Sequence, residues 1–178
     1  MTTRSATNSH GQDTLVEVLI DQIYPLAAMI IANGEEHEPM IFICNKGKVV
    51  GVKSMLKLPE AIWPTLQPYL LAKGFDFVIL LTEAWAHMPE NPSPADLRIV
   101  SLITEGKLRV SELPQRKEVL VFNVAAPGGL QWLCPCKIDR VARTLTRMPT
   151  QALHDPMNTA TGGFVVRPKT TPEPHVAH

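Results

Sequence analysis

An apolar run from Phe77 to Trp85 constrains the fold of this chain more than any other stretch. It reads Phe-Val-Ile-Leu-Leu-Thr-Glu-Ala-Trp, it follows Gly74, and a proline-rich loop begins shortly after it. A helix needs ten or more residues, whereas a short aliphatic and β-branched run between turn signals is typical of a buried strand. We therefore interpret this run as the central strand of a sheet.

The length and composition favour one globular domain with tails. The 178 residues are 45% hydrophobic, which is ample for a sizeable core. Seventeen basic residues balance seventeen acidic ones, so we expect no nucleic-acid partner. The N-terminus is polar, no long apolar span is evident, and the three cysteines are an odd number, so we expect a soluble cytoplasmic protein without a membrane partner.

The N-terminal region predicts an arm followed by an amphipathic helix. Residues 1–12 are polar and should be flexible. A capping-box pattern begins at Thr14, and apolar residues then recur at helical spacing up to a stop at Asn33-Gly34. Pro25 lies within this segment and should kink it or split it in two.

Two hairpins are predicted on either side of the central strand. The runs 40–44 and 49–52 flank a short turn at Asn45 to Lys48, and the run 119–124 is joined to 130–134 by a turn containing two glycines. Parallel neighbours would need long crossovers, so these short connections predict antiparallel pairing.

Further elements are predicted between and within the hairpins. Pro68 is placed in the first turn of a helix that ends at Lys73, and Ser93 begins a short surface helix. Pro135 marks its strand as an edge strand or the site of a bulge. The buried helix face should comprise Trp63, Leu66, Tyr69 and Leu70. The core face of the last strand should comprise Leu130, Trp132, Cys134, Cys136 and Ile138, with the opposite face in water.

Together these elements predict an α+β fold. We expect a mainly antiparallel sheet of about five strands, beginning near residues 40, 49, 77, 118 and 130, with two or three helices mostly on one face. The domain should span 13–147, with 148–178 mostly flexible. Residues 162–167 either dock as a short strand or stay disordered.

Two short motifs carry a resemblance. The strand ending Thr82-Glu83-Ala84-Trp85 and the later strand opening Arg116-Lys117-Glu118-Val119-Leu120 resemble a family of small uncharacterised microbial proteins, over roughly residues 14–140. The resemblance implies a fold and carries over no activity, cofactor or catalytic residue.

The residues able to carry chemistry form no diagnostic motif. Cys134 and Cys136 share one strand face and are weak candidates for a soft metal, but zinc prefers four ligands and no second cysteine pair follows. Burial of free thiols in the core is the simpler interpretation. No phosphate loop or nucleophile elbow is present in the sequence, and we expect no cofactor.

A second set of candidates lies where the apolar strands end. Glu83, His87, Arg116 and Glu118 could supply acid, base and anion-binding groups. If the strands run antiparallel as neighbours, Glu83 should form an ion pair with Arg116 or Lys117. That pair would either close the sheet or belong to a functional site.

Two classes of function remain open. The central strand and the strand from Val119 are apolar on both faces, which favours a non-catalytic interaction protein or accessory subunit that contacts another protein or a second copy of itself. The alternative is a small enzyme built on the four candidates at the Glu83 end of the strands.

Overall fold

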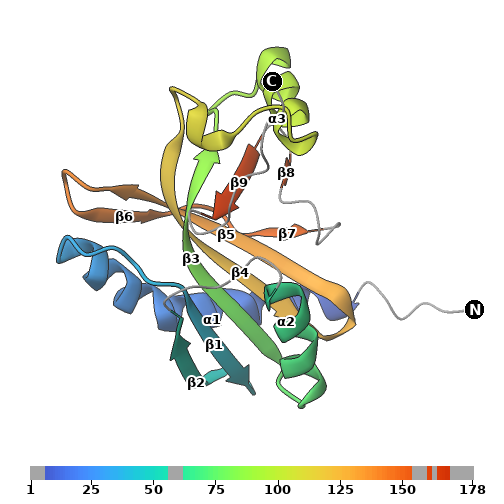
Figure 1. Cartoon of the computed structure of the whole chain (residues 1–178). Helices are drawn as coiled ribbons and strands as arrows, with labels where there is room; N and C mark the ends of the chain where they lie inside the picture. Colours follow the sequence, from blue (N-terminus) through green and yellow to red (C-terminus); the bar gives the residue numbers. More distant parts are fainter. Residues whose placement is uncertain (1–6, 56–61, 154–159, 162–163, 169–178) are drawn as a thin grey trace, which may run out of the picture.

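The computed structural model describes residues 7–55, 62–153, 160–161 and 164–168. In these residues a curved antiparallel sheet is flanked by three α-helices (Figure 1). The helices are α1 (Thr7–Ala32), α2 (Ile62–Ala72) and α3 (Pro94–Thr104), with 3-10 turns η1 (Val110–Glu112) and η2 (Pro127–Gly129). The strands are β1 (Met40–Asn45), β2 (Lys48–Ser54), β3 (Phe77–His87), β4 (Lys117–Ala126), β5 (Leu130–Asp139), β6 (Thr144–Arg147), β7 (Gln151–Leu153), β8 (Ala160–Thr161) and β9 (Phe164–Pro168).

The sheet confirms the α+β class and the antiparallel pairing. Its strand order is β2-β1-β3-β4-β5-β6, while β7 pairs with β5 and β9 pairs with both β3 and β8. Every pairing between the described strands is antiparallel. The described sheet has nine strands rather than about five. The four additional strands are short and follow residue 143, which is why the sequence did not indicate them.

The predicted central strand, β3, runs through the whole sheet as a long, bent ribbon (Figure 1). One side pairs with β4 from Val78 to Ala86. The other side pairs first with β1, up to Leu81, and then with β9, from Ala84. Because neighbours flank most of its length, all its residues except Trp85 are buried.

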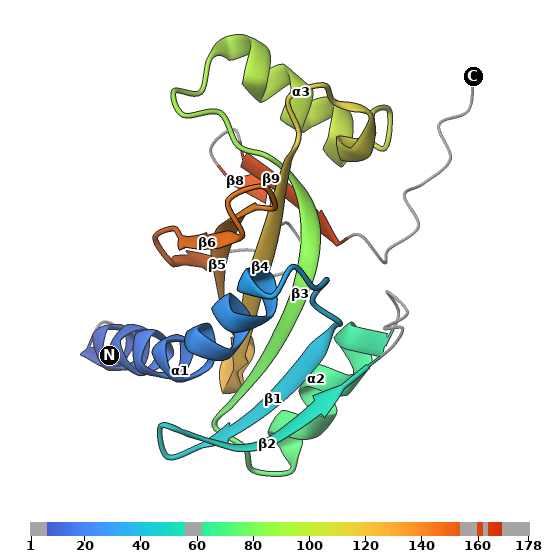
Figure 2. The same ribbon diagram turned by 90° about the vertical axis from the view of Figure 1, so that its left-hand side faces the viewer.

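The helices lie on opposite faces of the sheet, which corrects the expectation that they pack mostly on one face (Figure 2). The α1 side is lined by Phe77, Ile79 and Leu81 of β3, and the α2 side by Val78 and Leu80. Consecutive strand residues point to opposite faces, so a strand that is apolar on both faces needs cover on both. The sequence showed that need but not which helix meets it.

Helix α1 begins earlier than predicted and continues through its proline. It starts at Thr7, so the second half of the predicted flexible arm is helical, and residues 1–6 lie outside the described part. Pro25 is inside the helix, which bends along its length (Figure 2). The predicted stop is confirmed, because Gly34 adopts a φ of 81° and donates its N–H to the carbonyl of Ile31.

The apolar character of α1 corrects another expectation. The segment Gly11–Ala32 has a mean hydropathy of 1.8 and is long and apolar enough to span a membrane, as judged by length and composition only. In this fold a third of the segment is buried, and its buried side chains pack against the sheet.

Helix α2 differs from its prediction in two details. Pro68 lies in the middle of the helix instead of its first turn, and Tyr69 is 56% exposed instead of buried. Pro64 and Pro68 are both exposed, so water can satisfy the carbonyl that lacks the Pro68 N–H. The side chains that do pack on the sheet are Trp63, Leu66, Leu70 and Leu71.

The segment from residue 148 onward contributes strands β7, β8 and β9 where a mostly flexible tail was expected. The prediction that Pro135 marks an edge strand or a bulge is wrong, because β5 has neighbours on both sides and its register with β4 continues through Pro135. Pro135 lies where the outer neighbour of β5 changes from β7 to β6. The face of β5 expected in water is largely covered, because Leu133 packs with Leu153 of β7 and with Met148. Strand β9 docks on β3 as one of the two alternatives predicted, so the described fold extends beyond residue 147.

Candidate functional site

The structure brings together two of the four candidates, Glu83 and Glu118, through an arginine that sequence reasoning missed. Arg140, which follows β5, donates from Nη2 to Glu83 Oε1 and Glu118 Oε1, at 2.6 Å each. Its Nε also donates to Glu118 Oε1 at 3.0 Å, and its Nη1 donates to the Glu35 carbonyl at 2.8 Å. Nothing in the sequence links Arg140 to residues 57 and 22 positions away.

Glu83 is held in a gap between two strands. Its position on β3 falls between the end of the β1 pairing at Leu81 and the start of the β9 pairing at Ala84. The residue is 5% exposed, and its Oε1 also accepts the backbone N–H of His37 at 2.6 Å. The carboxylate therefore joins the connection between α1 and β1 to the centre of the sheet.

The single guanidinium of Arg140 is shared between two carboxylate partners, Glu83 and Glu118. Hydrogen bonds to Glu118 and then to Glu83 raise the pKa of the guanidinium, although its partial burial acts in the opposite direction. A guanidinium already shared between two carboxylates is a poor binding site for an external anion. The arrangement is suited to fastening segments together.

His37 is the other residue of this cluster that sequence reasoning did not select. It is 4% exposed, and its Nδ1 lies 2.7 Å from the Glu38 carbonyl. Its Nε2 has no hydrogen-bond partner among the described residues. Burial lowers the pKa of the imidazole, and the nearby carbonyl of Glu38 and carboxylate of Glu83 offset only part of that effect.

The other two candidates lie elsewhere, and the predicted ion pair between Glu83 and Arg116 is wrong. The register sets Glu83 opposite Leu120, four residues from Arg116, which is about 13 Å along the strand. Arg116 instead lies over the ring of Trp85, 4.8 Å from its centroid, and donates from Nη1 to the Leu113 carbonyl.

His87 belongs to the junction between β3 and α3. It is 1% exposed, and its Nε2 lies 3.2 Å from Asp96 Oδ1, without the alignment of a hydrogen bond. Ser93 begins α3 as predicted, and Asp96 forms a capping box with it; the hydrogen bonds from Ser93 are the main cause of the lowered pKa of the Asp96 carboxyl. His87 therefore contacts a helix cap and does not meet Glu83.

The two clustered thiols lie under α1. Cys134 and Cys136 are fully buried in the core that α1 covers, and Cys134 Sγ lies 3.5 Å from the Met148 carbonyl. A hydrogen bond from Cys136 is the largest cause that lowers the pKa of Cys134 to about 6, and Arg147 contributes in the same direction. The same contact raises the pKa of Cys136. Among the described residues no group of three or more His, Cys, Asp or Glu side chains could hold a metal ion.

A large apolar surface remains exposed along α1 and the neighbouring edge strand. We call it the α1–β2 surface. It comprises Leu15 (40% exposed), Val18 (43%), Leu26 (38%), Met29 (54%), Val50 (58%) and Val52 (56%). The four helix residues recur at helical spacing and form one stripe beside the stripe that packs on the sheet.

Hydrogen bonds show which way this stripe faces. Gln22 lies within the stripe, donates from Nε2 to the Gly47 carbonyl at 2.9 Å and accepts the Val49 N–H at 3.4 Å. The exposed stripe of α1 therefore lies on the side of the helix next to the β1–β2 hairpin. Val52 pairs with Phe42, which packs under α1, so Val52 lies on the same face of the sheet as the helix.

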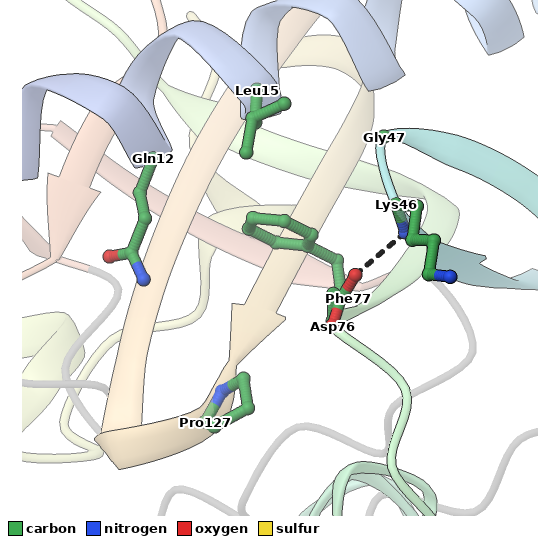
Figure 3. Close-up of a pocket in the computed structure, with 7 residues that line it drawn as sticks. All are labelled: Gln12, Leu15, Lys46, Gly47, Asp76, Phe77 and Pro127. Carbon is green, nitrogen blue, oxygen red and sulfur yellow. Dashed lines mark hydrogen bonds between the residues drawn. The ribbon is translucent and has the colours of Figure 1, made fainter. Parts of the chain in front are cut away.

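A cleft opens at the end of this surface (Figure 3). It has a volume of about 460 Å³ and lies between the start of α1, the β1–β2 turn, the start of β3 and η2. Phe77 lies at its centre, and Asp76 at its rim accepts the Lys46 N–H at 2.6 Å. Its lining residues are Gln12, Leu15, Lys46, Gly47, Asp76, Phe77 and Pro127.

Comparisons of the chain with protein-family models, with curated proteins and with solved structures find no match. The resemblance to small microbial proteins therefore stays a prediction.

Proposed function

We propose that this protein is a non-catalytic binding module that takes up an extended segment of a partner protein on the α1–β2 surface. The observation that carries the proposal is the exposure of six large apolar side chains, between 38% and 58%, on one side of α1 and on the adjacent edge strand. Exposed apolar patches of this kind mark interaction sites in soluble proteins.

Strand addition to β2 is the binding mode that the topology supports. Strand β2 is the last in the strand order, and no described strand pairs with its outer edge. An extended segment that pairs with this edge would satisfy its backbone N–H and C=O groups. Every second side chain of that segment would then face α1, where Leu26 and Met29 are exposed.

The charge of the edge favours an acidic and apolar segment. Lys46, Lys48 and Lys53 are exposed, and none of them forms an ion pair with a described residue. Glutamate or aspartate in the added strand would lie beside these ammonium groups. A second copy of this chain would instead bring the lysines of two β2 strands together, which opposes self-association through this edge.

The enzyme alternative has less support. Glu83 and Glu118 are both engaged by Arg140, while His87 and Arg116 lie on separate contacts. The four residues do not converge on one substrate position, which a catalytic site requires.

A peptide-binding measurement tests the proposed function. Two labelled peptides of the length of β2, 7 residues, are compared by fluorescence anisotropy: one alternates glutamate and valine, the other lysine and valine. We expect saturable binding of the acidic peptide only. The double variant Met29→Ser and Val52→Ser should weaken binding at least about tenfold, and Lys53→Glu should also weaken it.

The matched control removes an apolar side chain elsewhere. Leu97 is 53% exposed on α3, which lies at the opposite end of β3 from α1 and β2 (Figure 1), so Leu97→Ser should leave the affinity unchanged. Equal binding of both peptides, or equal loss in the control and the double variant, would contradict the proposal. If light scattering shows that the wild-type protein is a dimer and that the double variant is a monomer, the occupant of the α1–β2 surface is a second copy of this chain and not a segment of a partner protein.

A further inference from the structure

We propose that the partner segment carries an aromatic residue just C-terminal to its strand-forming part, and that this aromatic side chain fills the cleft at the end of the α1–β2 surface. The inference rests on the proposed function, because it names a second element of the same partner. It also gives the direction in which that partner binds.

The cleft is continuous with the α1–β2 surface. Leu15 belongs to the exposed apolar stripe and also lines the cleft. Gly47, in the turn that leads into β2, lines it as well, and a Cβ atom at Gly47 would lie 3.4 Å from Leu15 Cδ2. A segment that covers the stripe beside β2 therefore meets the cleft at this turn.

The interior of the cleft suits a large aromatic side chain that has a polar atom. Its volume of about 460 Å³ falls within the range of about 300–1,000 Å³ that is typical of ligand pockets. The Phe77 ring lies at its centre, and Leu15 and Pro127 add apolar walls (Figure 3). Gln12 lines the α1 side, and its carboxamide can accept a hydrogen bond from an indole N–H or a phenol O–H.

Contacts hold the walls of the cleft in place in the free protein. The β1–β2 turn is tied to the start of β3, since the Lys46 N–H donates to Asp76 Oδ2 at 2.6 Å. The Phe77 ring packs against Trp132, with ring centroids 6.2 Å apart. A cleft that exists before binding saves the partner the cost of ordering it, which favours affinity.

The topology sets the direction of the partner. Strand β2 begins at Lys48, directly after the turn that lines the cleft, and ends at Ser54. Every pairing between the described strands is antiparallel, and a strand added in the same way runs from the Ser54 end to the Lys48 end. Its C-terminal end therefore reaches the cleft, while its N-terminal end lies about 20 Å away, at about 3.3 Å per residue.

Extended forms of the acidic peptide test the inference by fluorescence anisotropy. Tryptophan is added after the C-terminus or before the N-terminus, through linkers of two or four glycines that span up to about 7 and about 14 Å. Alanine replaces the tryptophan in the control peptides. We expect the C-terminal tryptophan to tighten binding about tenfold relative to alanine, and the N-terminal tryptophan to have no effect.

Variants of the protein locate the added contact. Gln12→Ser combined with Pro127→Ser should bring the C-terminal tryptophan and alanine peptides to equal affinity. Leu97→Ser, on α3, is the matched control and should keep the tenfold difference. In the wild-type complex we expect nuclear Overhauser effects from the indole to the Leu15 methyl groups and the Phe77 ring.

The outcomes separate this inference from the proposed function. If the alanine peptides bind and the C-terminal tryptophan adds nothing, the aromatic anchor is wrong and the proposed function stands. A gain from the N-terminal tryptophan, or a gain that survives in the double variant, would also overturn the anchor. Failure of every peptide to bind would overturn the proposed function and the anchor with it.

Discussion

At the scale of single residues, Arg140 holds the middle of the molecule together. Its guanidinium joins the carbonyl of Glu35, before β1, to Glu83 on β3 and Glu118 on β4. The backbone of His37 completes the set by donating to Glu83. One side chain in the β5–β6 turn therefore links segments spread over more than one hundred residues of sequence.

Replacing Arg140 should destabilise the protein strongly. Arg140→Met keeps an aliphatic stem but leaves the buried Glu83 carboxylate without its guanidinium. We expect a loss of about 3 kcal/mol in the free energy of unfolding, at the low end for a broken buried pair because Arg140 is 29% exposed. Urea denaturation measures this as a lower midpoint at unchanged slope.

Two comparisons sharpen that measurement. Lys107→Met removes an exposed ion pair with Glu105 and should leave the midpoint unchanged within error. The double variant Glu83→Gln and Arg140→Met should lose less than the sum of the single variants, because the two side chains are in contact. A loss for Arg140→Met no larger than for Lys107→Met would show that the cluster is not structural.

His37 gives the stability a pH dependence with a definite sign. Burial lowers the pKa of His37 below its ordinary value of 6.5 in the folded state. Between the folded and unfolded pKa values the unfolded chain binds more protons, so stability is present above about pH 6.5 and declines as the pH falls. Wild type should therefore lose more unfolding free energy between about pH 7.5 and about pH 5.5 than His37→Gln. Parallel pH profiles for the two proteins would contradict this.

Residue-scale contacts of this kind were the least predictable part of the molecule. The residue types at the ends of the strands correctly drew attention to Glu83 and Glu118. The partner could not be inferred, because the choice between Arg116 and Arg140 depends on strand register and on the position of the β5–β6 turn. Glu83 lies opposite Leu120, and neither local pattern nor propensity encodes that alignment.

At the scale of elements, prediction succeeded where the signal is local. The β1–β2 turn, the Gly34 stop and the Ser93 cap each depend on a few adjacent residues with fixed backbone preferences. Prediction failed where contacts between distant parts of the chain decide whether a segment forms a helix or a strand. The early part of α1 is tied to the sheet by the hydrogen bond from Trp132 Nε1 to Asp13 Oδ1, at 2.7 Å, which its polar sequence does not reveal.

The C-terminal strands illustrate the same limit. Strands β7 and β9 are short and lack a periodic pattern, so the sequence resembles a tail. They form because β5 and β3 offer unpaired edges at these positions. The outer edge of β2 is an edge of the same kind. No described strand pairs with it.

At the scale of the whole molecule, β3 connects two regions of apolar packing. Its first half lies between α1 and α2, and its second half carries β9 and approaches α3 and η1 (Figures 1 and 2). The two-sided hydrophobicity that suggested a protein partner is satisfied largely within the chain. The exposed apolar side chains of the α1–β2 surface lie outside the buried core, and they now carry the interaction hypothesis.

The measurement that tests this account most directly is an NMR structure of the complex with the acidic peptide. We expect intermolecular nuclear Overhauser effects from the peptide to the methyl groups of Val50, Val52 and Met29, and slowed amide exchange along the outer edge of β2. Contacts confined to the Glu83 and Arg140 cluster, or an unchanged β2 edge in the presence of bound peptide, would contradict the account.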